Sequence, residues 1–226
     1  MIDIFYKSYS ADFKWIYHSL RSLKKNVTGY NRVIILIPKM HMDLFDTRDL
    51  PPNTEVHYVS EYGTGYLYQQ WCKISAHNYS KADYIMFADS DCIFDHEIYL
   101  FDFIKDGKPE ILYTDYSKVG DAICWKEVTE AFIKEPQQYE FMRRNCLIYH
   151  RSTLEAIAAY EPNLEFIIMN GERFSEFNAI GAYAYKYERD KYNFVNTDEW
   201  TYTPPKAVQY HSYTEFDKMK SEFKEL

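Results

Sequence analysis

Apolar and polar positions along the first hundred residues predict strands that alternate with helices. The strands are read from short apolar runs rich in β-branched and aromatic side chains, the pattern of strands buried on both faces of a sheet. The four predicted strands are residues 2–9, Arg32–Pro38, 55–59 and 84–88. Apolar residues spaced three and four apart predict a helix that begins after Asp12 and ends before Gly29, and a second that follows the glycine-containing turn at residues 63–65.

The second half of the chain predicts strands and helices without a regular alternation. Its predicted strands are residues 110–115, 141–150 and 208–211, with a short one near Phe194. Its predicted helices are residues 98–104, 127–133, 152–160 and 175–187, and residues 216–226 form either a charged helix or a frayed tail. The whole pattern predicts an α/β fold with a Rossmann-type, mostly parallel central sheet flanked by helices, and a mixed C-terminal half.

Composition limits the functions to be considered. A length of 226 residues, of which 46% are hydrophobic, fits one domain with its own core. The formal net charge of −8 argues against a general polyanion binder, although a local basic patch is compatible with it. The sequence has no long apolar run and begins with a strand pattern instead of a signal peptide, so we expect a cytoplasmic protein without a membrane span. The four cysteines are widely separated and lack zinc-site spacing, which favours reduced thiols.

The most informative stretch is Asp89-Ser90-Asp91, which follows directly on the predicted strand at residues 84–88. Two carboxylates at the end of a buried strand are unfavourable unless a positive charge holds them, and a divalent cation with oxygen ligands is such a partner. In open α/β sheets, ligands bind at the carboxyl ends of strands, where this pair is expected. The alternative is that the three residues form a turn or a helix cap. The apolar residues on both sides of the stretch favour a metal and ligand site.

Two common phosphate-binding motifs are absent from the sequence. No Gly-x-Gly-x-x-Gly opens a helix, and there is no P-loop with its lysine. A dinucleotide-binding or P-loop enzyme is therefore disfavoured. If the chain binds a phosphate group, a metal ion has to replace the missing cradle.

The order of these landmarks resembles the GT-A glycosyltransferases, and most of all the small bacterial or phage proteins with an Asp-Ser-Asp motif and a downstream Ser-Glu-Phe segment. The landmarks span about residues 2–212 and are a polar turn at residues 6–10, a Gly-rich turn and helix with Gln69, Gln70 and Lys73, the Asp-Ser-Asp strand end, an acidic helix start at residues 175–178, and a late histidine, His211. The resemblance implies a single GT-A-like domain, in which residues 1–95 bind the nucleotide sugar and residues 96–226 bind the acceptor. A phage-encoded member would work in the host cytoplasm.

The resemblance also implies a hexosyl- or pentosyltransferase. Such an enzyme moves a sugar from a nucleotide-sugar donor, foremost a UDP-sugar, to an acceptor hydroxyl, here with inversion. A Mn²⁺ or Mg²⁺ ion would neutralise the charge on the leaving diphosphate. Asp91 would bind the ion directly, Asp89 would bind the ion through a water or contact the ribose, and His211 would be a late metal ligand. Glu176 would be the general base for the acceptor hydroxyl.

The other candidates for donor binding lie at the end of the first strand, on the helix before the Asp-Ser-Asp strand, and between the two acids. They are Tyr6, Ser8, Tyr9, Lys73 and Ser90. Simpler alternatives stay open for three assignments: a surface histidine for His211, a helix cap for Glu176 and a solvated lysine for Lys73. In a retaining enzyme, Glu176 would orient a substrate instead of acting as the base.

The acceptor and the class of function leave further alternatives. The acceptor is either a cell-surface glycan or a hydroxymethylated base in phage DNA. DNA calls for a basic stripe, and the candidates for it are Arg143, Arg144, Arg151, Arg173 and Lys186. The negative net charge argues against DNA. The second class of function is a catalytically inactive module that binds a nucleotide sugar or a metal. A phosphatase or nucleotidyltransferase is disfavoured because its motifs are absent.

Overall fold

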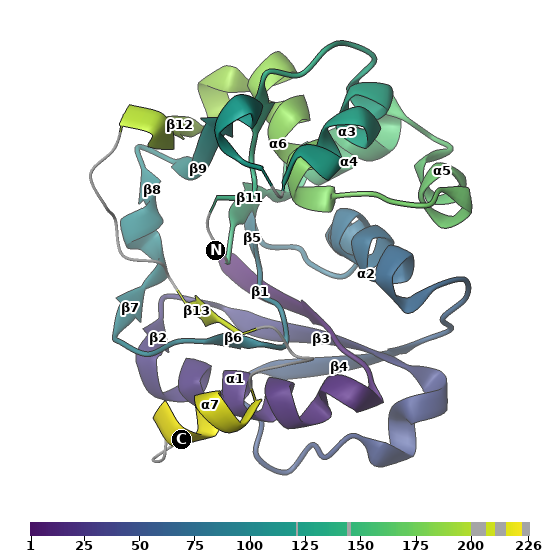
Figure 1. The fold of residues 1–226 in the computed structure, drawn as a ribbon. Coiled ribbons are helices and arrows are strands. Elements are labelled where there is room, and N and C mark those ends of the chain that lie inside the picture. The colour runs from purple at the N-terminus through teal and green to yellow at the C-terminus, as the bar shows by residue number, and fades with distance from the viewer. Residues whose placement is uncertain (121, 144–145, 200–206, 211–215, 223–226) are drawn as a thin grey trace.

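A five-stranded sheet lies at the centre of the computed structural model, which describes residues 1–120, 122–143, 146–199, 207–210 and 216–222 (Figure 1). Its strands, in spatial order, are β11 (Ile148–His150), β5 (Tyr84–Phe87), β1 (Ile2–Lys7), β3 (Arg32–Pro38) and β4 (Thr54–Val59). The last four are parallel, whereas β11 pairs antiparallel with β5. The predicted α/β fold with a mostly parallel central sheet is confirmed.

Helices cover both faces of this sheet, which explains why its central strands are apolar almost throughout. Helix α1 (Phe13–Asn26) packs on one face, and α2 (Gly65–Ile74), α4 (Arg151–Tyr160) and α6 (Glu176–Tyr187) pack on the other (Figure 1). Successive strand residues alternate between the two layers, as the pleat requires. In β1, for example, Phe5 joins the core under α2, α4 and α6, whereas its neighbours Ile4 and Tyr6 join the core under α1.

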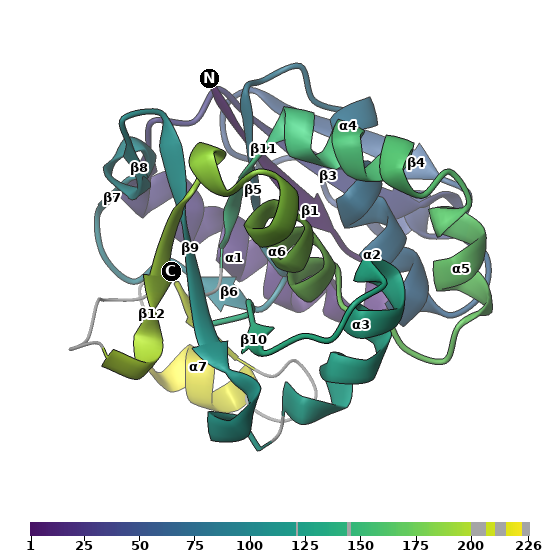
Figure 2. The same ribbon diagram turned by 90° about the horizontal axis from the view of Figure 1, so that it is seen from above.

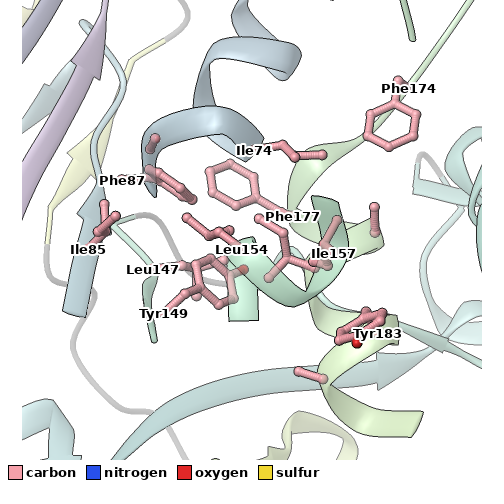
Figure 3. Packing of buried hydrophobic residues seen from close by; sticks show 14 of the residues in the cluster. Ile74, Ile85, Phe87, Leu147, Tyr149, Leu154, Ile157, Phe174, Phe177 and Tyr183 are labelled. Carbon is pink, nitrogen blue, oxygen red and sulfur yellow. The ribbon is translucent and has the colours of Figure 1, made fainter. Parts of the chain in front are cut away.

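The larger core is built mainly from aromatic and branched aliphatic side chains of β5, β11, the three helices above them and the segments that adjoin these elements. Figure 3 shows ten of them by name: Ile74, Ile85, Phe87, Leu147, Tyr149, Leu154, Ile157, Phe174, Phe177 and Tyr183. Phe87 is the last residue of β5, two positions before Asp89, and its ring contacts those of Tyr149 and Phe177. The end of the strand is therefore fixed by packing before the chain reaches the two acids.

A second, smaller sheet lies in the C-terminal half. Its middle strand is β9 (Lys108–Asp115), which pairs antiparallel with β10 (Tyr139–Glu140) and β8 (Ile104–Lys105) and parallel with β12 (Asn193–Asn196). Figure 2 shows β9 and β12 side by side. This mixture of parallel and antiparallel pairs agrees with the prediction of a mixed second half.

Two short strand pairs connect distant parts of the chain. β2 (Val27–Thr28) pairs with β7 (Ile98–Tyr99), and β6 (Cys92–Ile93) pairs with β13 (Val208–Gln209). The second pair brings Val208 and Gln209 beside the end of the Asp-Ser-Asp stretch.

The remaining helices surround these sheets. Three are α-helical: α3 (Lys126–Ile133), α5 (Leu164–Asn170) and α7 (Phe216–Glu222). The 3₁₀ helices are η1 (Ser10–Asp12), η2 (Lys39–Leu44), η3 (Ser75–Asn78), η4 (Leu100–Phe103), η5 (Tyr116–Lys118), η6 (Ala122–Trp125), η7 (Arg189–Lys191) and η8 (Thr197–Glu199). Within the described ranges, no helix combines the length and hydrophobicity that a membrane crossing requires.

Two of the predicted elements differ from the structure. The helix predicted at residues 98–104 is a short strand followed by η4, because Ile98 pairs with Val27 of β2. Among the described residues, the strand predicted at residues 141–150 is reduced to β11, since Cys146 has a φ of 60°, which no extended strand accommodates. Helix α5 was not predicted at all.

Candidate functional site

The carboxyl ends of β1 and β5 meet at the point where the sheet changes its direction of winding. β1 has β3 on one side and β5 on the other, so the connections that leave these neighbouring strands diverge. In open α/β sheets, such a point forms a ligand-binding crevice. Ser8 follows β1 and Ser90 follows β5, and the Ser90 hydroxyl donates a 2.9 Å hydrogen bond to Ser8 Oγ.

A cavity of about 240 Å³ opens at this edge of the sheet. Its walls come from α2, from the Asp-Ser-Asp stretch, from the start of α6 and from β13. Five predicted site residues line it together: Lys73, Asp89, Ser90, Asp91 and Glu176. The structure thus gathers residues from positions 73 to 176 of the chain around one hollow.

Lys73 stands between two acids inside this cavity. Its Nζ donates to Asp89 Oδ1 and to Glu176 Oε1, each at 2.7 Å, and lies 4.4 Å from the centre of the Phe177 ring. The side chain is only 2% exposed, so the alternative of a solvated lysine is wrong. Burial by itself would lower the pKa of Lys73, but the charges and hydrogen bonds of the two carboxylates outweigh it and raise that pKa. Lys73 is therefore a cation held in place by Asp89 and Glu176.

Glu176 is the first residue of α6 and is 3% exposed. Ser175 provides the helix cap, because its side chain accepts a hydrogen bond from the backbone N–H of Asn178. The backbone N–H of Glu176 donates to Gln70 Oε1 at 3.1 Å, which fixes the helix start against α2. Burial raises the pKa of Glu176, and the positive charge of Lys73 acts in the opposite direction. The carboxylate is thus positioned toward the cavity while a neighbouring residue caps the helix.

Asp91 is the acid with the weakest compensation. Its carboxylate accepts a hydrogen bond from Gln209 Nε2 at 3.3 Å, and no ion pair joins it to a described cationic residue. Burial, followed by the nearby charge of Asp89, raises the pKa of Asp91 to about 7. A bound cation would favour the ionised form of such a group. The backbone of Asp91 is held firmly, since its carbonyl accepts the Tyr210 N–H at 3.0 Å.

The donor chemistry of the site fits a hard divalent cation in part. Asp91 and Asp89 offer carboxylate oxygens on either side of Ser90, although Asp89 Oδ1 already accepts from Lys73 and, at 2.9 Å, from Gln69. No group of three histidine, cysteine or acidic side chains suited to a metal is found within the described ranges. His211, the predicted third ligand, lies outside them.

The three residues predicted to contact the nucleotide at the end of β1 lie in different environments. Tyr6 is completely buried, and its hydroxyl lies 3.0 Å from Ser19 Oγ of α1. We correct the expectation for Tyr6, because a ligand cannot reach a ring enclosed between the sheet and α1. Ser8 is 1% exposed and bonded to Ser90, so it supports the loop. Tyr9 is 43% exposed and lies outside the cavity wall, where a larger ligand has access to it.

Several residues of the cavity wall were not predicted from the sequence. They are Asp12, Tyr66, Trp125, Met142 and Gln209. The rings of Tyr66 and Trp125 are nearly parallel, with centroids 6.3 Å apart. For Tyr66 the sequence does contain a signal: it precedes Gln69, Gln70 and Lys73 by three, four and seven positions, which places all four on one face of α2. Trp125 and Gln209 come from distant segments without such a signal.

Comparison of the chain with protein-family models gives no match, and comparison with curated proteins gives no significant match.

Proposed function

We propose that this chain is a metal-dependent glycosyltransferase of the GT-A type, which moves a sugar from a nucleotide-sugar donor to an acceptor hydroxyl. The observation that carries the proposal is the shared cavity of Asp89, Asp91 and Glu176, with Lys73 buried between two of them. The cavity lies at the switch point of a mostly parallel sheet, where α/β proteins bind nucleotides. This combination supports a site for a charged leaving group on one side and a proton acceptor on the other.

Asp91, with Asp89 beside it, would hold a Mn²⁺ or Mg²⁺ ion. When bound, such an ion supplies positive charge to a leaving nucleoside diphosphate. Asp91 suits this role because nothing cationic among the described residues neutralises it. Asp89 is shared with Lys73, so it also connects the cation side of the cavity to Glu176.

Glu176 is the general base in this proposal. As the acceptor oxygen forms its bond to the anomeric carbon, its proton passes to the Glu176 carboxylate. The bond between the anomeric carbon and the diphosphate oxygen breaks, and its electron pair leaves with the diphosphate. Lys73 holds Oε1 of Glu176, which fixes the orientation of the carboxylate and favours its ionised form. Attack from the side of Glu176 inverts the configuration of the sugar.

Release of nucleoside diphosphate from a panel of nucleotide sugars, with Mn²⁺ and with excess EDTA, tests this function. Glu176→Gln should reduce transfer by about 10²–10⁴-fold while donor binding persists. Asp91→Ala should abolish release, as should EDTA. Glu97→Gln, which changes an exposed glutamate that does not line the cavity, is the matched control.

Three outcomes would argue against the proposal or a part of it. Normal turnover of Glu176→Gln would remove the base assignment. Normal turnover of Asp91→Ala, or of the wild type in EDTA, would reject the metal mechanism. Donor binding without any release of diphosphate would identify an inactive binding module. Such binding is measurable by thermal shift, since a ligand at 100 times its Kd adds about 2.7 kcal/mol of stability.

A further inference from the structure

A second and larger cavity lies between α3 and α5, and we call it the α3–α5 cavity. Its volume is about 530 Å³, within the usual range of small-molecule sites. Apolar side chains line much of it: Val128, Ala131 and Phe132 of α3, Ile167 of α5 and Phe174 of the segment that follows. Phe132 and Phe174 belong to the core, whereas Ala131 and Ile167 are exposed. The cavity is therefore an apolar hollow with a fixed floor and an open side.

The α3–α5 cavity adjoins the cavity of the candidate active site through two shared stretches of chain. Cys124 lines the α3–α5 cavity, and the next residue, Trp125, lines the active-site cavity. Phe174 lines the former, and Ser175 and Glu176 line the latter. In both views of the ribbon, α3 lies between α6 and α5 (Figures 1 and 2). A ligand whose reacting group lies at Glu176 has this hollow directly beside it.

The segment that runs from the α3–α5 cavity, at Phe174, to the active-site cavity, at Ser175 and Glu176, is held in place. The Tyr66 hydroxyl donates a 2.5 Å hydrogen bond to the carbonyl oxygen of Phe174. On the other side of the segment, the Phe174 ring packs edge-on against Phe132, with centroids 6.0 Å apart. The α3–α5 cavity is thus built into the same rigid connection that positions Glu176.

The charges around the α3–α5 cavity do not favour a polyanion. Its charged lining consists of Glu127, Glu161, Glu172, Lys134 and Arg173, which is three acids against two bases. One base is already neutralised, because Lys134 lies 3.3 Å from Glu161. Phosphate groups of a nucleic acid would meet a net negative rim here.

The basic residues that would form a DNA-binding stripe are mostly paired as well. Three of the five candidates form ion pairs with acids near them. The pairs are Arg143 with Glu140, Arg151 with Glu155, and Lys186 with Glu135. Arg173 is the candidate that lines the α3–α5 cavity, and Arg144 lies outside the described residues. Among the described candidates, charge that is already paired adds little to phosphate binding.

We infer, building on the proposed transferase, that the acceptor is an amphipathic hydroxyl compound, with its hydroxyl beside Glu176 and an uncharged alkyl or aryl group in the α3–α5 cavity. The apolar lining, the volume and the two places where neighbouring residues line the two cavities carry this assignment. It selects an acyl-, alkyl- or aryl-bearing glycoside over DNA as the substrate class. The transfer step itself is unchanged: the acceptor proton goes to Glu176, and the diphosphate leaves with the electron pair of the broken bond.

Calorimetric titration with butyl, hexyl and octyl β-glucosides tests the inference without a donor. Each methylene group that the cavity takes up should tighten binding about fourfold, so octyl should bind at least about tenfold more tightly than butyl. Ala131→Trp fills the cavity from its exposed side and should abolish the dependence on chain length. Ala159→Trp, at an exposed position of α4 outside the cavity, is the control and should keep it. A thermal midpoint near that of the wild type confirms that each variant folds.

The possible results separate this inference from the proposed function. Equal affinities for the butyl and octyl glucosides would overturn the inference, as would a chain-length dependence that survives in Ala131→Trp. If the wild type still releases diphosphate in either case, the proposed transferase function stands without this acceptor. Salt-dependent binding of duplex DNA would replace it with a nucleic-acid acceptor. Chain-length-dependent binding in a protein that releases no diphosphate from any donor would overturn the acceptor role and reject the transferase.

Discussion

Asp91 allows a test of the candidate site that needs no substrate. Its pKa is raised from 3.8 to about 7, first by burial and then by the charge of Asp89. Because the folded protein holds this proton more tightly than the unfolded chain does, the ionised carboxylate opposes folding. The penalty is absent below the unfolded pKa near 4, grows between pH 4 and 7, and is complete above pH 7.

The size of the effect follows from the shift. A difference of about three pH units, at 1.36 kcal/mol for each, corresponds to an upper limit of roughly 4 kcal/mol at pH 8. Asp91→Asn keeps the side-chain size and an acceptor oxygen for Gln209, but it carries no charge. At pH 8 the free energy of unfolding of the variant should therefore be higher than that of the wild type. Its advantage at pH 5 should be smaller by roughly 3 kcal/mol.

Urea unfolding in EDTA at pH 5, 6, 7 and 8 measures this difference. Asp102→Asn, at an exposed position that does not line the cavity, controls for the loss of one negative charge. Adding Mn²⁺ in place of EDTA should stabilise the wild type and leave Asp91→Asn unaffected. Parallel pH profiles for the wild type and Asp91→Asn would refute the reasoning, since they would mean that Asp91 ionises equally easily in the folded and unfolded chain.

Two further predictions concern packing and charge within the core. Lys73→Met leaves the Asp89 and Glu176 carboxylates without their shared cation. It should therefore lower the free energy of unfolding, measured by urea titration, by about 3–5 kcal/mol. A loss below about 1 kcal/mol would show that the two ion pairs of Lys73 contribute little to stability. Gly181→Ala places a Cβ 2.3 Å from Phe141 Cβ and should lower stability by roughly 1–3 kcal/mol. If that contact is the cause, the penalty of the added methyl should shrink when Phe141→Gly, which removes that Cβ, is already present, and an undiminished penalty would place the cause elsewhere.

Continuous apolar runs made the centre of the fold predictable. The boundaries of β3 match the sequence-based prediction residue for residue, because an apolar run between polar ends is buried on both faces of the sheet. Elements whose form depends on a distant partner were missed. β7 exists because β2 lies beside it, although its apolar spacing is equally compatible with a helix. Helix α5 has two exposed apolar residues, Phe166 and Ile167, so its sequence lacks a clean helical stripe.

The acidic residues of the candidate site were predictable from the sequence, whereas the contacts between distant residues were not. Asp89 and Asp91 stand out because acids end an apolar strand, and Ser175 with Glu176 because they open a helix. The environment of Lys73 was not predictable, since its two partners lie 16 and 103 residues away along the chain. Tyr6 was misassigned because alternation along a strand shows that neighbours face opposite sides, but not which side a helix covers.

The antiparallel strand β11 has a consequence for how the chain divides. It belongs to the second half by sequence, yet it completes the sheet of the first half by pairing with β5. A fragment that stops near residue 95 would present the row of backbone N–H and C=O groups on β5 to other molecules. Such a fragment should self-associate through that open strand, so residues 1–95 depend on β11 for their solubility.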